Sequence, residues 1–381
     1  MTDTTAPEVH GFAADKFERV RDVLAANLAS GEDVGASYTA MLDGEVLVDI
    51  WGGYQDVDRT KPWERDTIIN VWSTTKTMSF LCMHMLADRG ELDFYAPVAK
   101  YWPEFAANGK EGVQVRHIMS HSAGLCGYDE PLHQDDFQNH DKLVALHAAQ
   151  APWWEPGTQS GYHAISQGFL LGEILKRITG VSLGTFFRTE VAEPLGADFH
   201  IGTPAELDHR VALVIPPSTP LSTEGVTEDS IAYRTFTNPL TEATIAHSIG
   251  WRRAEIPAAN GHGNARSVAL VQSIISGNGE RNGKRFLSEA SVQRIFEEQT
   301  NGMDLVLGVE ARFGMGYGLS NSVTPLPETS CFWGGWGGSL VIVDPTTRLT
   351  ICYVMNRMGE GTTGDLRGSS LAMATLVGVM S

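Results

Sequence analysis

Ser73 and Lys76 form a Ser-x-x-Lys pair that can act as a nucleophile and its base. If residues 73–89 form a helix, the two side chains lie on one face, one turn apart, and the amine can accept the hydroxyl proton. The residues that follow are apolar almost all round, which predicts a buried helix and a lysine pKa lowered by burial. The alternative is a helix-capping serine beside a surface lysine. Against it, the chain has only eight lysines, and no other lies three residues after a serine.

A helix start at Ser73 also offers backbone N–H groups and a positive dipole end to an oxyanion. A further candidate is Tyr162, in the string Ser-Gly-Tyr-His-Ala at 160–164, which runs into a predicted helix. A phenol at a helix start can project into a cleft and carry protons between nucleophile, leaving group and water. Taken alone, Tyr162 would be interpreted as a core tyrosine with a backbone partner.

Glycines and tryptophans alternate in Phe-Trp-Gly-Gly-Trp-Gly-Gly-Ser at 332–339, directly before an apolar run. Glycines in a strand are typical of a bulge or of a ligand that approaches the backbone closely. We therefore expect Trp333, Gly334, Gly335 and Trp336 to bind substrate and to supply a second oxyanion N–H group. The alternative is a tight turn with two packed tryptophans.

The elements that must position these groups are strands at both chain ends and helices between them. Strands are predicted at 36–42 and 46–51, joined by Asp43-Gly44, and at 331–333, 340–343 and 349–355, with a turn at Asp344-Pro345. Helices are predicted at 13–29, 73–89, 163–178, 265–276 and 288–299. Residues 202–240, rich in Pro, Thr and Ser, predict a long irregular excursion.

This order predicts an α+β protein: an antiparallel sheet built from N- and C-terminal strands, flanked by helices, with an inserted, mainly helical lobe. We expect one catalytic unit over 1–381, with a sheet lobe of 1–75 and 255–381 and a helical lobe of 76–254.

The amino-acid composition restricts the kinds of partner that we expect this protein to bind. A net charge of −18 disfavours binding to nucleic acid and to anionic membrane surfaces. The sequence contains no run of ~18 apolar residues, so we expect no membrane-spanning helix. The chain start lacks the basic region followed by an apolar region that is typical of a secretory signal. The four cysteines lie far apart in the sequence, so we expect reduced thiols in a cytoplasmic protein. No cofactor is expected. His117, His121 and His262 are candidate metal ligands, but no His-Glu-x-x-His string accompanies them, so no metal is expected.

The motifs together resemble the penicillin-binding protein and β-lactamase superfamily, and more closely the class C β-lactamase-like carboxylesterases of family VIII. Supporting strings are Tyr-Trp-Pro-Glu-Phe at 101–105, Arg-His-Ile-Met-Ser-His-Ser-Ala-Gly-Leu at 116–125 and Gly-His-Gly-Asn-Ala at 261–265. The resemblance runs from about residue 34 to 356 and implies a β-lactamase/transpeptidase-like fold. It implies Ser73 as nucleophile, Lys76 as base, Tyr162 as proton shuttle, and the N–H groups of Ser73 and Trp336 as oxyanion hole.

Two departures from the β-lactamase pattern affect the expected substrate. Trp333-Gly334-Gly335 stands where β-lactamases carry Lys-Thr-Gly, so the cation that would pair with a β-lactam carboxylate is missing. Ala164 stands where they carry the asparagine of Tyr-x-Asn. Both changes favour neutral esters. Tyr128, Trp153 and Trp154 are further candidates for the wall of the cleft.

The resulting hypothesis is a serine carboxylesterase that hydrolyses small neutral esters through a Ser73 acyl-enzyme. An acyltransferase that uses an alcohol or amine, and a weak β-lactamase, are alternatives with the same chemistry. A cell-wall DD-peptidase fits less well, because the Lys-Thr-Gly cation and an export signal are absent. A non-catalytic binding or assembly protein of the same fold is the alternative from a different class. The oligomeric state is not determined by the sequence.

Overall fold

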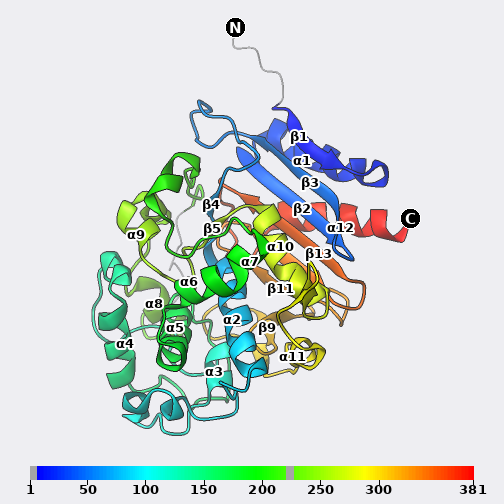
Figure 1. Cartoon of the computed structure of the whole chain (residues 1–381). Helices are drawn as coiled ribbons and strands as arrows, with labels where there is room; N and C mark the ends of the chain where they lie inside the picture. The colour runs from blue at the N-terminus through cyan, green and yellow to red at the C-terminus, as the bar shows by residue number, and fades with distance from the viewer. Residues whose placement is uncertain (1–6, 220–226) are drawn as a thin grey trace.

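The strand-forming runs at the two chain ends pair with each other in one sheet (Figure 1). A computed structural model describes residues 7–219 and 227–381, and in these residues the sheet has nine strands. Every neighbouring pair in it is antiparallel. In spatial order the strands are β1 (Val9–Ala13), β3 (Glu45–Gly53), β2 (Gly35–Leu42), β13 (Leu349–Met355), β12 (Leu340–Asp344), β11 (Cys331–Gly334), β10 (Gly318–Leu319), β9 (Glu310–Phe313) and β8 (Thr300–Met303).

The junction between the chain ends is the pairing of β2 with β13, from Leu42 opposite Leu349 to Ala36 opposite Met355. The predicted β2–β3 hairpin is confirmed: Asp43 and Gly44 both have positive φ, as a two-residue turn that matches strand twist requires. Two short ladders lie outside the sheet, β4 (Ile69–Asn70) with β5 (His262–Gly263) and β6 (Glu280–Arg281) with β7 (Lys284–Arg285).

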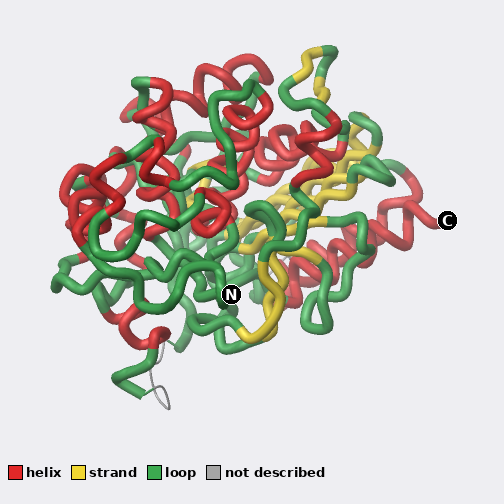
Figure 2. Tube along the Cα trace, turned by 90° about the horizontal axis from the view of Figure 1, so that it is seen from below, coloured by secondary structure: helices red, strands yellow, loops and turns green. Residues whose placement is uncertain are grey.

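Helices lie on both sides of the sheet, as the view from below shows (Figure 2). In the described residues they are α1 (Glu18–Ser30), α2 (Lys76–Asp88), α3 (Val115–Met119), α4 (His140–Ala149), α5 (Ser166–Thr179), α6 (Leu183–Phe187), α7 (Glu193–Leu195), α8 (Ile231–Thr237), α9 (Ile249–Arg253), α10 (Ala265–Ser276), α11 (Glu289–Arg294) and α12 (Leu366–Met380). Most of those between α2 and α9 gather beside the sheet (Figure 1). The architecture is the expected α+β arrangement; the lobe boundaries at 76 and 254 stay a prediction.

Neighbouring side chains of the interior strand β2 form hydrogen bonds to helices on opposite faces of the sheet. The Tyr38 hydroxyl donates to the Leu371 carbonyl of α12 at 3.2 Å. The neighbouring Ser37 hydroxyl accepts from the Ala265 N–H at the start of α10, at 3.1 Å. Successive strand residues point to opposite faces, so a sheet buried on both sides must satisfy polar groups on each.

Several predicted boundaries were wrong at the ends of elements. The helix predicted at 13–29 begins only at Glu18, because Val9–Ala13 add the edge strand β1 to β3. The helix predicted at 288–299 ends at Arg294, and strand β8 follows at Thr300. Residues 202–240 are largely irregular as predicted, although they contain a 3₁₀ helix (Ala205–Arg210) and α8; residues 220–226 lie outside the described residues.

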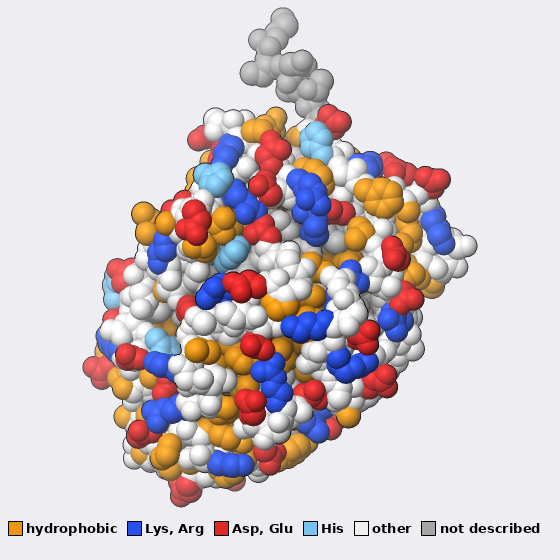
Figure 3. Space-filling model, viewed as in Figure 1, with side chains coloured by type: hydrophobic (Ala, Val, Ile, Leu, Met, Phe, Trp, Pro, Cys, Tyr) orange, Lys and Arg blue, Asp and Glu red, His pale blue; other side chains and the backbone are white. Residues whose placement is uncertain are grey.

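The surface carries both signs of charge. Acidic and basic side chains are interspersed over the face drawn in Figure 3. No helix in the described part of the chain is long and apolar enough to cross a membrane. All four cysteines, Cys82, Cys126, Cys331 and Cys352, are buried and free.

Candidate active site

The Ser73 turn lies between strand β4 and helix α2. Ser73 is part of a 3₁₀ turn (Trp72–Thr75), and Lys76 is the first residue of α2. Trp72 has φ of +47°, a left-handed conformation that is strained for a bulky residue. The rings of Trp251 and Trp336, with centroids 5.7 and 4.9 Å from that of Trp72, hold it in place. The turn thus places the Ser73 hydroxyl, still 8% exposed, at the wall of a cleft.

Lys76 is fully buried, and its amine has three hydrogen-bonding neighbours. Nζ lies 3.1 Å from Ser73 Oγ and donates to the carbonyls of Ala164 (2.6 Å) and Ala258 (3.0 Å). Burial lowers the pKa of Lys76 well below its ordinary value of 10.5. A neutral amine has two N–H donors and one lone pair. In the neutral form, the two carbonyls would satisfy both donors and leave the lone pair for the Ser73 hydroxyl.

Tyr162 reaches the same oxygen from the opposite segment. Its hydroxyl donates to Ser73 Oγ at 2.7 Å, and its ring centroid lies 4.9 Å from Lys76 Nζ. Burial raises the pKa of Tyr162, so the phenol keeps its proton. The contact with Ser73 and the nearby indole N–H of Trp333, which has no hydrogen-bond partner itself, lower this pKa against the larger effect of burial.

The backbone around Tyr162 differs from the prediction. Helix α5 begins at Ser166, so Tyr162 precedes it by four residues instead of standing at its start. Hydrogen bonds from other segments hold this irregular stretch: the Tyr162 N–H donates to Asp304 Oδ1, and the His163 N–H to His121 Nδ1, both at 3.0 Å. These partners are distant in sequence, so local pattern gave no signal for them.

The glycine-rich segment lies against the Ser73 turn. Trp333 and Gly334 end β11, and Gly335 and Trp336 follow it. A methyl group on Gly335 would overlap the Val71 carbonyl oxygen and lie 3.4 Å from the Ser73 nitrogen. Among the described residues, the N–H groups of Ser73 and Trp336 donate to no protein acceptor. Both predicted oxyanion donors therefore belong to adjoining segments and remain unpaired.

A largely apolar cleft opens at Ser73, Tyr162 and Trp336. Tyr128 lines it as predicted, with its buried hydroxyl unpartnered. Its apolar lining also includes side chains that the sequence did not single out: Phe137, Ile165, Phe236 and Pro239. Trp153 and Trp154, which we expected in the wall, do not line it. Their indole N–H groups instead donate to Asp129 and to the Gln159 carbonyl.

A second cleft is lined by Tyr162, Trp333 and Gly334 but not by Ser73. Its one arginine, Arg312, pairs with Glu298 and Glu328 at 2.7 and 2.8 Å. The cation in this cleft is thus already neutralised.

The three histidines considered as metal ligands hold backbone groups instead. His117 Nδ1 accepts from the Gln114 N–H at 3.2 Å, His121 Nδ1 accepts from His163, and His262 Nδ1 lies 2.8 Å from the Asn260 carbonyl oxygen. Burial lowers the pKa of His117 to about 4 and that of His262 to about 3. In the described ranges, no group of three or more His, Cys, Asp or Glu is arranged to hold a metal ion.

Fold and site together define a serine hydrolase with a lysine beside its serine. The chain belongs to the β-lactamase family, whose model, described as "Beta-lactamase", matches residues 20–372. It is 35% identical to "Esterase/beta-lactamase LipL" of Mycobacterium tuberculosis over 92% of this chain and 83% of that protein. A crystal structure of a family VIII carboxylesterase superposes with a TM-score of 0.91 at 40% identity, covering 97% of this chain and 100% of the other. A penicillin-binding protein homologue from Caulobacter crescentus gives 0.89 at 33% identity, with the same coverage.

Proposed function

We propose that this protein is a carboxylesterase that hydrolyses small neutral esters through an acyl-enzyme on Ser73. The observation that carries the proposal is the Ser73 hydroxyl held between Lys76 Nζ and the Tyr162 hydroxyl at the wall of an apolar cleft. The esterase relatives support the reaction class.

In the proposed mechanism, neutral Lys76 takes the Ser73 proton as Oγ attacks the ester carbonyl. The N–H groups of Ser73 and Trp336 hold the resulting oxyanion. Tyr162 gives its proton to the departing alkoxide, and the Lys76 ammonium then restores it. Deacylation runs these proton transfers in reverse. Lys76 takes the Tyr162 proton, the Tyr162 oxygen takes a proton from the attacking water, and the Lys76 ammonium returns a proton to the departing Ser73 Oγ, which frees the acid and Ser73.

The two clefts suggest how the ester is divided. The apolar cleft touches Ser73 and the Trp336 segment, so we assign it to the acyl group. The second cleft touches Tyr162 but not Ser73, which suits a leaving alcohol that Tyr162 protonates. Because Glu298 and Glu328 already neutralise Arg312 there, a carboxylate on the leaving group finds no free cation in that cleft. This favours neutral esters over penicillins.

The four buried free thiols support a cytoplasmic location.

The deciding experiment compares wild type, Ser73→Ala and the control Ser276→Ala, which removes another buried serine hydroxyl on α10. Each is incubated with p-nitrophenyl acetate and butyrate and with a chromogenic cephalosporin, and adducts are sought by intact mass. We expect ester turnover and an acyl adduct in wild type and control, both lost in Ser73→Ala. Faster cephalosporin than ester cleavage would favour the β-lactamase alternative, and no adduct with any substrate would favour a non-catalytic protein.

A further inference from the structure

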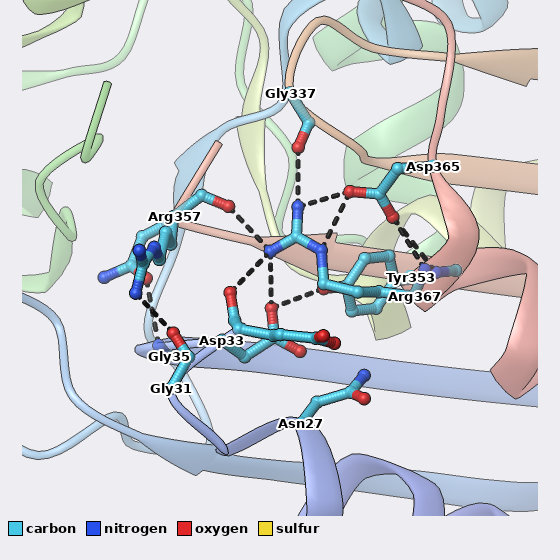
Figure 4. Close-up of polar contacts among 12 residues, drawn as sticks. Asn27, Gly31, Asp33, Gly35, Gly337, Tyr353, Arg357, Asp365 and Arg367 are labelled. Carbon is cyan, nitrogen blue, oxygen red and sulfur yellow. Dashed lines mark hydrogen bonds and ion pairs between the residues drawn. The ribbon is translucent and has the colours of Figure 1, made fainter. Parts of the chain in front are cut away.

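Arg367, near the start of α12, lies in a buried network that reaches the Trp336 loop (Figure 4). Only 9% exposed, it uses donors on all three guanidinium nitrogens. Nη2 donates to the Gly337 carbonyl at 2.8 Å, and Nε to Asp365 Oδ2 at 2.8 Å. Nη1 donates to Asp33 Oδ1 at 2.9 Å and to the carbonyls of Glu32 (3.0 Å) and Arg357 (2.9 Å). One side chain thus joins both ends of the chain to the residue after Trp336.

Asp33, an acidic partner of Arg367 in this network, is almost completely buried. Asp33 is 1% exposed, and its Oδ1 also accepts from the Tyr353 hydroxyl at 2.6 Å. Burying an ion pair costs desolvation energy, and the attraction between the two charges often does no more than offset that cost. A buried pair is therefore weak evidence that these residues stabilise the fold. A rigid guanidinium fork, in contrast, fixes the directions of several acceptors at once.

In the second glycine pair of the motif, Gly338 makes room for this side chain and Gly337 makes room for Met358. A methyl group on Gly338 would overlap Asp365 Oδ2 and lie 2.8 Å from Arg367 Nη2. Gly337 is held from both sides: its N–H donates to the Gly361 carbonyl at 2.8 Å, and its carbonyl accepts from the Gly359 N–H at 2.7 Å. The glycines at 337 and 338 therefore accommodate protein contacts rather than a ligand.

Trp336 lies between two glycines, which by themselves leave its backbone free to rotate. On one side the Gly335 N–H is fixed by the Ser339 carbonyl at 2.8 Å; on the other, Gly337 is fixed by Arg367 and the 359–361 segment. We propose that Arg367 is a positioning residue, which orients the Trp336 N–H toward the carbonyl oxygen of the ester that Ser73 attacks. This inference rests on the proposed ester chemistry and adds a residue that never touches substrate.

The test compares Arg367→Met and Arg367→Lys with the control Arg266→Met. Arg266 also makes a two-pronged contact with an aspartate, Asp49, at 2.7 and 2.9 Å, but its partners lie outside the loop. For p-nitrophenyl butyrate we expect Arg367→Met to lower kcat about 10- to 100-fold with little change in KM, because the donor acts on the transition state. The Ki of phenylboronic acid, whose Ser73 adduct places an oxygen in the oxyanion hole, should rise by a similar factor. Arg367→Lys should recover part of both losses.

Thermal unfolding of each variant gives the temperature at which all are folded. A folded Arg367→Met with kcat and boronate affinity within about twofold of wild type would overturn the inference, as would an equal loss in Arg266→Met. If Arg367→Met does not fold, Asp365→Asn loosens the same fork and should show the same kcat and Ki changes. Absence of ester turnover by wild type would refute the proposed function instead, and the boronate adduct would still test the positioning.

Discussion

Replacing Lys76 with methionine removes the amine and keeps an unbranched side chain of similar length in the same buried position. The carbonyls of Ala164 and Ala258 then lose their partner, at a cost of about 1–3 kcal/mol each in the free energy of unfolding. That cost is independent of pH. The informative quantity is how the stability difference between wild type and Lys76→Met changes with pH.

Burial lowers the pKa of Lys76 well below 10.5, whereas in the unfolded chain the amine titrates near that ordinary value. Between the two values the folded protein holds a neutral amine and the unfolded chain a protonated one. The unfolded state thus binds one more proton, so the free energy of unfolding rises with pH by about 1.4 kcal/mol per unit. Methionine binds no proton, and the contributions of all other titratable groups cancel when the free energies of unfolding of the two proteins are subtracted. If folded Lys76 is neutral from pH 7 upward, as the proposed mechanism requires, wild type should gain roughly 2 kcal/mol over Lys76→Met between about pH 7 and 8.5.

Urea unfolding of both proteins at several pH values measures this slope. The control is Lys110→Met: Lys110 is also buried, and its Nζ donates to three carbonyls, those of Ala107, Ala148 and Gln150. Burial lowers the pKa of Lys110 too, but three carbonyl acceptors require three N–H donors, so we expect it to stay protonated and the difference to stay flat. A flat difference for Lys76→Met as well would mean that folded Lys76 is charged, and the general-base role would be refuted.

Two further changes test the remaining groups of the site. Tyr162→Phe should lower kcat about 10²- to 10⁴-fold for ethyl butyrate but much less for p-nitrophenyl butyrate, because nitrophenolate leaves without a proton; equal losses would contradict the acid role. Gly335→Ala should lower kcat about 10²-fold, because the added methyl overlaps the Val71 carbonyl and displaces the loop from Ser73. Gly112→Ala, where nothing lies within 4 Å of the added methyl, is its control, and comparable kcat values for the two variants would argue against the oxyanion loop.

Features set by neighbouring residues could be predicted from the sequence. The helix at 265–276 matches α10 at both ends, since an apolar face, the Asn264 cap and a following glycine are all local. The Ser73–Lys76 contact is local as well, because three residues of helix bring the two side chains to the same face. Motif order also predicted that strands from both chain ends share a sheet.

Tertiary structure alone decided where the predicted groups meet and what surrounds them. Lys76 is held by carbonyls 88 and 182 residues away, and because every residue type carries a carbonyl, no sequence pattern marks these acceptors. The strand at Val9–Ala13 forms because β3 offers it an open edge, a tertiary contact that the local pattern does not indicate. The sequence by itself thus determined the contact between Ser73 and Lys76 and the class of fold. The carbonyls that hold the Lys76 amine, the approach of Tyr162 and the contacts of Arg367 with the Trp336 loop depend on distant segments, which only the folded chain brings together.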